Sequence, residues 1–199
     1  MTKKDKNYYK IQHKKFKILQ QGYKMKKNII VLAFFVLLFC ACSKDATQDL
    51  KYEIKGLSKE GDFILSKLQK PAIVYFGYTF CPDVCPTTLF MVNNAMDELK
   101  IDAQIVFISV DLERDKLENC DIFAKDFRKD AICVRLEQDE LDKVAANYGV
   151  KYKIERKDGE ISVAHSPYVY LIKDGKLVSE ISNLAQKALK RELLKIKAN

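Results

Sequence analysis

The 199-residue chain lacks tryptophan, and it contains only two histidines, four prolines and seven glycines. Internal repeats, low-complexity tracts and Gly-rich phosphate loops are also absent. These absences exclude collagen-like and other repeat architectures, and the balance of hydrophobic and charged residues excludes wholesale disorder. The residues that are present, 48% hydrophobic and 31% charged, are typical of a globular protein whose length allows one domain with a sizeable core.

A formal net charge of +8 is typical of proteins that bind nucleic acid, but the position of the charges along the chain argues against such a partner. Residues 1–24 contain eight Lys and one Asp, and Lys26 and Lys27 add two more positive charges. From Cys42 onward the chain carries 25 basic and 26 acidic residues. The basic character therefore belongs to the N-terminal segment, and we expect no nucleic-acid partner.

A charge-free apolar run of thirteen residues, 29–41, follows Met25 and two lysines. Its length fits the core of a signal peptide and falls short of the roughly 20 residues that span a bilayer. The run ends in LFCAC, which resembles the lipobox of bacterial lipoproteins, whose cysteine receives a diacylglyceryl group. We therefore expect residues 25–41 to be a lipoprotein-type signal peptide and Cys42 to be lipidated; an uncleaved N-terminal anchor is the alternative.

This interpretation divides the chain and leaves few metal-binding side chains. Residues 1–24 are a basic extension or the result of a mis-assigned start, residues 42–50 are a tether, and residues 51–199 are the folded domain. Thiols outside the cytoplasm tend to be oxidised or held by a metal. Once the signal peptide and the lipidated residue are set aside, four cysteines remain as two possible pairs: Cys81, Cys85, Cys120 and Cys133. His165 is the single histidine after Cys42.

The hydrophobic pattern predicts alternating strands and helices. Continuous β-branched and aromatic runs predict three buried strands, at residues 71–78, 104–110 and 131–136. Helical spacing predicts three intervening helices, at residues 86–99, 117–127 and 139–148. Asp-Gly pairs predict two β-hairpins, at residues 150–164 and 168–181, and a Lys-rich helix at 183–197 closes the chain. This order predicts an α/β sandwich with a central sheet covered by helices.

Cys81 and Cys85 lie at the predicted junction between a strand and a helix, in the sequence CPDVCP. Residues four apart share one face of a helix, and a helix N-terminus favours thiolate over thiol. Three intervening residues leave room for an ion between the sulfurs, and soft thiolates select Cu(I), zinc or iron–sulfur clusters. A nearby imidazole would give a site of two sulfurs and one nitrogen, which is compatible with either oxidation state of copper. His165 precedes the predicted strand 168–172, whose preceding loop is within reach of the cysteines. Spacing alone leaves two alternatives open, a plain disulfide and a surface histidine.

Residues 75–89, YFGYTFCPDVCPTTL, closely resemble the signature of the Sco/SenC family, copper-binding thioredoxin-like proteins that help assemble the copper-A centre of cytochrome c oxidase. Two further segments, SVDLERD at 109–115 and HSPYVYLI at 165–172, are similar to that family's acidic loop and its histidine-plus-strand element. The resemblance covers about residues 51–190. It implies a thioredoxin-like three-layer sandwich with a central mixed β-sheet flanked by helices. It also implies that Cys81, Cys85 and His165 are the ligands of Cu(I) or Cu(II).

By this resemblance the protein is a copper chaperone, lipid-anchored in the cell envelope and facing the periplasm. The implied partner is the copper-A subunit of cytochrome c oxidase, and the implied metal-free form has a Cys81–Cys85 disulfide. Asp111 and the loop through Asp115 either support the site or face a partner, or they form a solvated helix-capping loop. The enzymatic alternative is a periplasmic thiol–disulfide oxidoreductase in which Cys81 or Cys85 attacks a substrate disulfide. A redox or copper sensor is a third hypothesis.

Two features depart from the family pattern. Pro167 and the YVYLIKDG that follows it resemble the cis-proline, strand and hairpin of thioredoxins, which favours thiol exchange; a trans proline at the start of a strand is the alternative. Cys120 and Cys133 are expected to form a structural disulfide between a helix and the next strand, worth roughly 3 kcal/mol. The alternative is that both are small buried hydrophobic residues.

Overall fold

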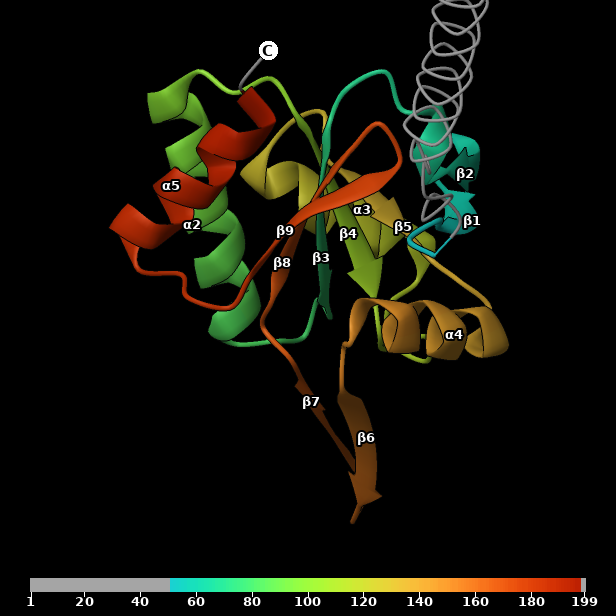
Figure 1. Cartoon of the computed structure of the whole chain (residues 1–199). Helices are drawn as coiled ribbons and strands as arrows, with labels where there is room; N and C mark the ends of the chain where they lie inside the picture. The colour runs from blue at the N-terminus through green and yellow to red at the C-terminus, as the bar shows by residue number, and fades with distance from the viewer. Residues whose placement is uncertain (1–50, 198–199) are drawn as a thin grey trace, which may run out of the picture. The chain divides into compact units, whose positions relative to one another are not determined.

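The computed structural model describes residues 51–197, and its centre is a five-stranded β-sheet (Figure 1). The strands lie in the order β5-β4-β3-β8-β9. Their bounds are β3 (Ala72–Gly77), β4 (Gln104–Ser109), β5 (Ile132–Val134), β8 (Val169–Lys173) and β9 (Lys176–Ile181). β3, β4 and β5 are parallel, whereas β8 and β9 run antiparallel to their neighbours. The prediction of a mixed central sheet is therefore confirmed.

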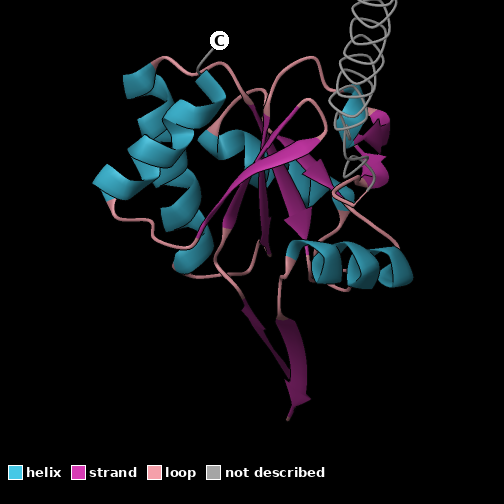
Figure 2. Ribbon diagram, in the orientation of Figure 1, coloured by secondary structure: helices cyan, strands magenta, loops and turns pink. Residues whose placement is uncertain are grey.

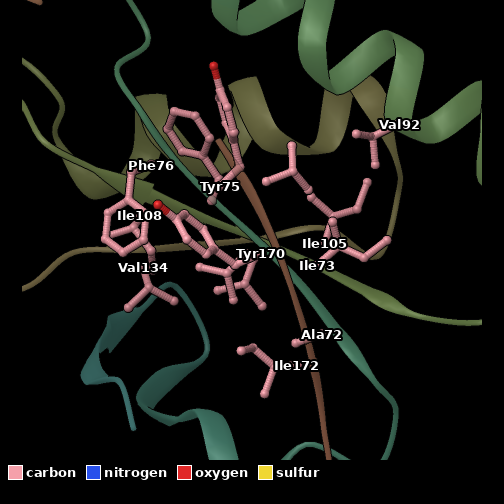
Figure 3. Close-up of a cluster of buried hydrophobic side chains, with 14 of the residues drawn as sticks. Ala72, Ile73, Tyr75, Phe76, Val92, Ile105, Ile108, Val134, Tyr170 and Ile172 are labelled. Atoms are coloured by element: carbon pink, nitrogen blue, oxygen red, sulfur yellow. The ribbon is translucent and has the colours of Figure 1, made fainter. Parts of the chain in front are cut away.

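Both faces of β3 are buried, which explains its uninterrupted apolar sequence. Successive side chains of a strand point to opposite faces, and this strand follows the rule. Tyr75 packs on one face, with its ring 6.2 Å from that of Phe107. Phe76 packs on the other face beside Tyr170 (Figure 3), with their ring centroids 6.0 Å apart. The Tyr148 ring lies 5.4 Å from that of Phe76. The core therefore continues through the sheet, and both faces need a cover.

Helices provide most of that cover (Figure 2). The four helices of the described residues are α2 (Val84–Leu99), α3 (Leu117–Phe127), α4 (Gln138–Tyr148) and α5 (Gln186–Lys197). α2 packs against α3 and α5 on the face that carries Tyr75, while α4 packs its Tyr148 on the face of Phe76. As the helical spacing predicts, α2 buries Leu89, Val92 and Met96.

The first elements of the described chain lie beside β5. β1 (Lys55–Ser58) and β2 (Gly61–Ile64) form a hairpin, and a short 3-10 helix, η1 (Leu65–Lys67), follows it. The backbones of Leu57 and Arg135 exchange two hydrogen bonds of 2.9 Å, which tie this hairpin to the chain just after β5.

A second hairpin projects from the end of the sheet (Figure 1). β6 (Tyr152–Lys157) and β7 (Glu160–His165) form their own two-stranded sheet, separate from the five-stranded one. Asp158 and Gly159 both have positive φ, as the two-residue turn predicted for an Asp-Gly pair requires. The prediction that the hairpin stops at residue 164 is one residue short, because His165 pairs with Tyr152 and is the last residue of β7.

The structure also decides the two departures from the family pattern. No peptide bond in residues 51–197 is cis, so the cis hypothesis for Pro167 is wrong. Trans is the preferred form of an X-Pro bond, and the Ser166 N–H, just before this proline, continues the hairpin by donating to the Lys151 carbonyl at 2.9 Å. Cys120 of α3 and Cys133 of β5 are joined by a disulfide with a Cα–Cα distance of 5.7 Å.

Several predictions concern residues that lie outside the described range. They are the basic extension 1–24, the signal peptide 25–41, the tether 42–50 and the lipidation of Cys42. Within residues 51–197, no helix combines the length and the apolar character that crossing a membrane requires.

Candidate metal centre

Three side chains meet beyond the C-terminal end of β3. Cys81 lies in the loop between β3 and α2, Cys85 lies in the first turn of α2, and His165 ends β7. The two Sγ atoms and a ring nitrogen all lie within 4.8 Å of one another. Cys85 Sγ is 3.3 Å from His165 Nε2, although the two residues are 80 positions apart. The structure therefore brings together the three residues that the sequence singled out.

Cys81 is a half-buried free thiol at the N-terminus of α2. Its sulfur accepts a hydrogen bond from the Cys85 backbone N–H, with a distance of 3.4 Å. Burial raises the pKa of Cys81, but hydrogen bonds from the backbone of Cys85 and Asp83 outweigh it, and the net result is a lowered pKa. A helix N-terminus favours the negatively charged form of a group in this position. Cys81 is therefore the thiol that most readily becomes a thiolate.

Cys85 is completely buried, and burial raises its pKa to about 12. Its sulfur lies against the backbone of β3 at Gly77. A Cβ atom on that residue would lie 3.0 Å from Cys85 Sγ and 2.9 Å from the Phe107 ring. Only glycine leaves the space that this sulfur occupies. The proton of Cys85 is consequently held firmly until another group accepts it or a metal replaces it.

A backbone contact holds the His165 ring in the tautomer that offers Nε2 as a metal ligand. Its Nδ1 lies 3.1 Å from the Ser166 carbonyl oxygen, which can only accept, so Nδ1 carries the proton and Nε2 presents its lone pair to Cys85 Sγ. Burial lowers the pKa of the ring and keeps it neutral. The rings of Tyr75 and Tyr78 meet it edge-on, with centroids 6.0 and 5.8 Å away. A hydrogen bond from the second ring nitrogen is the usual support of a metal-binding histidine.

The Tyr75 hydroxyl is a feature of the site that sequence reasoning missed. It is buried, and within the described residues it has no hydrogen-bond partner. The pKa of Tyr75 is raised well above its ordinary value, first by burial and then by charge on Cys85. The sequence contains one signal that could have revealed this role: the alternation of side chains along a strand places Tyr75 and Gly77 on the same face. A buried donor without a partner is costly, and a negatively charged sulfur is an acceptor that would satisfy it.

The loop after β4 is hydrogen-bonded to the turn that carries Cys81. Asp115 is fully buried, and its carboxylate accepts hydrogen bonds from the Thr79 N–H at 3.0 Å, the Thr79 hydroxyl at 2.6 Å and the Ser109 hydroxyl at 2.6 Å. Thr79 stands two residues before Cys81. Asp111 is buried as well and pairs with Arg114. The alternative of a solvated capping loop is therefore wrong for both aspartates, because water does not reach either carboxylate.

The donor set itself favours one kind of ion. Two sulfurs and one imidazole nitrogen are soft to intermediate ligands, which select metals such as Cu(I). A structural zinc site almost always has four protein ligands. Among the described residues, the group contains no fourth Cys, His, Asp or Glu. The arrangement thus fits a three-coordinate copper ion better than structural zinc.

The asymmetry of the two thiols predicts selective alkylation. In the reduced protein, iodoacetamide should modify Cys81 first, and its rate should stay high below the ordinary thiol pKa of about 8.5, falling only below the lowered pKa. Cys85 should stay unmodified until strongly alkaline pH, because it is buried and its pKa is about 12. Residue-resolved mass spectrometry over a pH series measures both rates. In denaturant, the matched control, the two rates should converge; equal rates in the folded protein would contradict the assignment.

Comparison with known proteins gives a consistent result. The sequence model of the SCO1/SenC family matches residues 66–196. Over 108 residues, 52% of this chain, the sequence is 39% identical to protein SCO1 homolog 1, mitochondrial, of Arabidopsis thaliana, and the match covers 32% of that protein. The SCO2-like protein RP587 of Rickettsia prowazekii is 34% identical over 107 residues, 51% of this chain and 52% of that protein. The chain therefore spans about a third to a half of the length of these relatives.

Solved structures share the fold over most of their length. Arabidopsis thaliana ScoI with copper bound is 30% identical, covers 73% of this chain and 96% of its own, and superposes with a TM-score of 0.66. Bradyrhizobium japonicum ScoI with copper bound is 33% identical, covers 72% of this chain and 97% of its own, and has a TM-score of 0.59. The prediction of a thioredoxin-like α/β fold is confirmed.

Proposed function

The chain belongs to the SCO1/SenC family, and from this premise we propose that it is a copper chaperone. It holds one copper ion through Cys81 Sγ, Cys85 Sγ and His165 Nε2. The observation that carries the proposal is the convergence of these three donor atoms within 4.8 Å. The neutral His165 ring and the readily ionised Cys81 support it, since metals bind neutral imidazole and thiolate.

The unequal exposure of the two cysteine ligands suits a copper ion that is transferred to another protein. Cys81 is half-buried at the rim, next to the exposed side chains of Phe80 and Val84, whereas Cys85 lies in the interior. Binding of copper removes the Cys85 proton, which its high pKa would otherwise retain, so loading releases a proton to solvent. A receiving protein reaches Cys81 first and takes the ion by ligand exchange. The proposed recipient is the copper-A subunit of cytochrome c oxidase.

The proposed location is the cell envelope, facing the periplasm, with a lipid on Cys42 as the anchor. The signal-peptide and lipobox patterns of residues 25–42 support it. The Cys120–Cys133 disulfide is independent support, because structural disulfides persist mainly in oxidising compartments. In the same compartment the metal-free protein would form a Cys81–Cys85 disulfide.

Copper titration tests the proposed function. The reduced full-length protein should bind one copper per chain, and the Cu(II) form should show a thiolate-to-copper charge-transfer band together with an EPR signal. The double variant Cys81→Ser/Cys85→Ser is the control and should lose both signals, because hydroxyl oxygens are poor ligands for soft copper. Absence of binding by the reduced protein, or unchanged binding by the double variant, would refute the proposal.

A second candidate function is thiol–disulfide exchange, which the lowered pKa of Cys81 favours. The Cys81 thiolate would attack a substrate disulfide, releasing one substrate thiolate and forming a mixed disulfide. Cys85 would then pass its proton to His165 Nε2, 3.3 Å away, and attack Cys81 Sγ. The second substrate sulfur would leave as a thiol, and the two electrons would reduce the substrate as the Cys81–Cys85 disulfide forms. The high pKa of Cys85 makes this second step slow, which favours the chaperone.

A further inference from the structure

The hairpin that carries His165 lies outside the main sheet. Among the described residues, β6 and β7 pair only with each other, whereas the loop of Cys81 and the helix of Cys85 continue directly from β3. His165 is joined by three residues to β8, and β8 pairs with β3 at Val169 and Tyr75, so the main sheet positions only the base of this hairpin. Beyond its base, contacts made by side chains hold the hairpin against the cysteine turn.

Arg114 makes such contacts with three parts of the molecule. Its Nη1 donates to the Ile161 carbonyl oxygen of β7 at 3.2 Å. Its Nε donates to the carboxylate of Asp111 in the loop after β4. Its guanidinium also lies over the rings of Phe80 and Tyr78, 4.9 and 5.8 Å from their centroids. Those two aromatic residues belong to the turn that leads into Cys81.

One end of this connection is buried in the loop after β4, and the other lies on the strand that carries His165. Asp111 is fully buried, and its other carboxylate oxygen accepts the Arg114 backbone N–H at 3.3 Å. Ile161 lies four residues before His165 on the same strand, which is roughly 13 Å along an extended chain. A displacement of the hairpin at Ile161 is therefore carried by the strand to the imidazole. The Arg114 side chain itself is only 23% exposed, so solvent screens the connection weakly.

We propose that Arg114 is a positioning residue that locks the β6–β7 hairpin onto the cysteine turn and so sets how long the Cys81–Cys85–His165 site retains its ion. The proposal rests on the proposed copper-binding function. Lysine cannot replace this side chain: a guanidinium donates in two fixed directions while its plane stacks on an aromatic ring, and an ammonium group does neither.

A second arginine supplies a matched control. Arg156, on β6 of the same hairpin, pairs with Glu113, the neighbour of Arg114. Their side chains are 60% and 52% exposed, and exposed ion pairs of this kind contribute little. Arg156→Lys therefore makes the same chemical change at a residue of the β6–β7 hairpin without altering the contacts of Arg114.

The experiment compares Arg114→Lys and Arg156→Lys in the full-length protein. After loading with copper, the rate of transfer to an excess of chelator should rise about 10-fold in Arg114→Lys. This is the lower end of the roughly 10–100-fold loss of metal affinity that typically follows removal of a group that supports a metal ligand. In the metal-free reduced protein, the ¹⁵N shifts of the His165 ring should also change. The pH profile of Cys81 alkylation should stay as in the wild type, because Asp115 still holds Thr79. Arg156→Lys should match the wild type in every measurement.

Unchanged copper transfer and unchanged His165 shifts in Arg114→Lys would overturn the proposal, as would equal effects in the two variants. An alkylation profile of Arg114→Lys that matches the unfolded chain would also overturn it, since the residue would then support the whole fold. If the wild type binds no copper, the proposed function fails, while the His165 shifts of the metal-free protein still test the positioning role.

Discussion

Replacement of His165 with alanine is expected to lower copper affinity by at least about 100-fold. Loss of a group that merely supports a ligand typically costs 10–100-fold, so loss of the sole nitrogen ligand costs at least as much. The two sulfurs remain in place, because Cys81 and Cys85 are held by α2 and by the loop after β4. Competition against a chelator of known affinity measures the change. His13→Ala, which alters the other histidine of the chain, should have no effect.

The same variant separates the two candidate functions. A chaperone predicts that His165→Ala loses copper and still reacts with a small disulfide through Cys81. An oxidoreductase predicts slower exchange, since His165 Nε2 is the nearest acceptor for the Cys85 proton, at 3.3 Å. Copper affinity equal to that of the wild type would remove His165 from the ligand set.

Loss of the Cys120–Cys133 disulfide should have the largest effect on stability. The double variant Cys120→Ala/Cys133→Ala is expected to lower the free energy of unfolding by about 3 kcal/mol, because a bond closing a loop of this length restricts the unfolded chain. The bond also ties α3 to β5, which at three residues is the shortest strand of the main sheet. Urea unfolding followed by circular dichroism measures the difference.

Reductant provides the control for this prediction. When both proteins are unfolded in excess reductant, the wild type loses the bond as well, and the difference should shrink to the small cost of removing two buried sulfurs. Equal stability without reductant would show that the bond does not contribute, and that the two residues act as buried apolar side chains.

Much of the fold could be predicted because its signals are local. The continuous apolar run of β3 indicates burial on both faces, the spacing of Leu89, Val92 and Met96 indicates a helix, and Asp158-Gly159 indicates a tight turn. Each depends on neighbours within a few residues. The hypothesis of a cis Pro167 came from the same kind of local likeness and was wrong, since the isomer depends on the surrounding structure.

The site was predictable only in part. Two cysteines four apart at a strand-to-helix junction are a local pattern, and His165 stood out because it is the single histidine after Cys42. The burial of Asp111 and Asp115 was not predictable, because charged residues in a loop are ordinarily solvated. The hydrogen bonds from Thr79 to Asp115 and from Arg114 to Ile161 cross 36 and 47 residues, and no local pattern signals them.

By itself, the amino-acid sequence determined which side chains are available for chemistry and which segments become strands and helices, since composition and periodicity act at short range. Only the tertiary structure decided how those side chains behave. The packing of α2 against β3 buries Cys85 and leaves Cys81 at the rim, so that two chemically identical thiols acquire opposite pKa shifts. The separate β6–β7 hairpin brings His165 Nε2 to the sulfurs. Burial and long-range contact are properties of the folded chain, and they convert three residues of the sequence into one site.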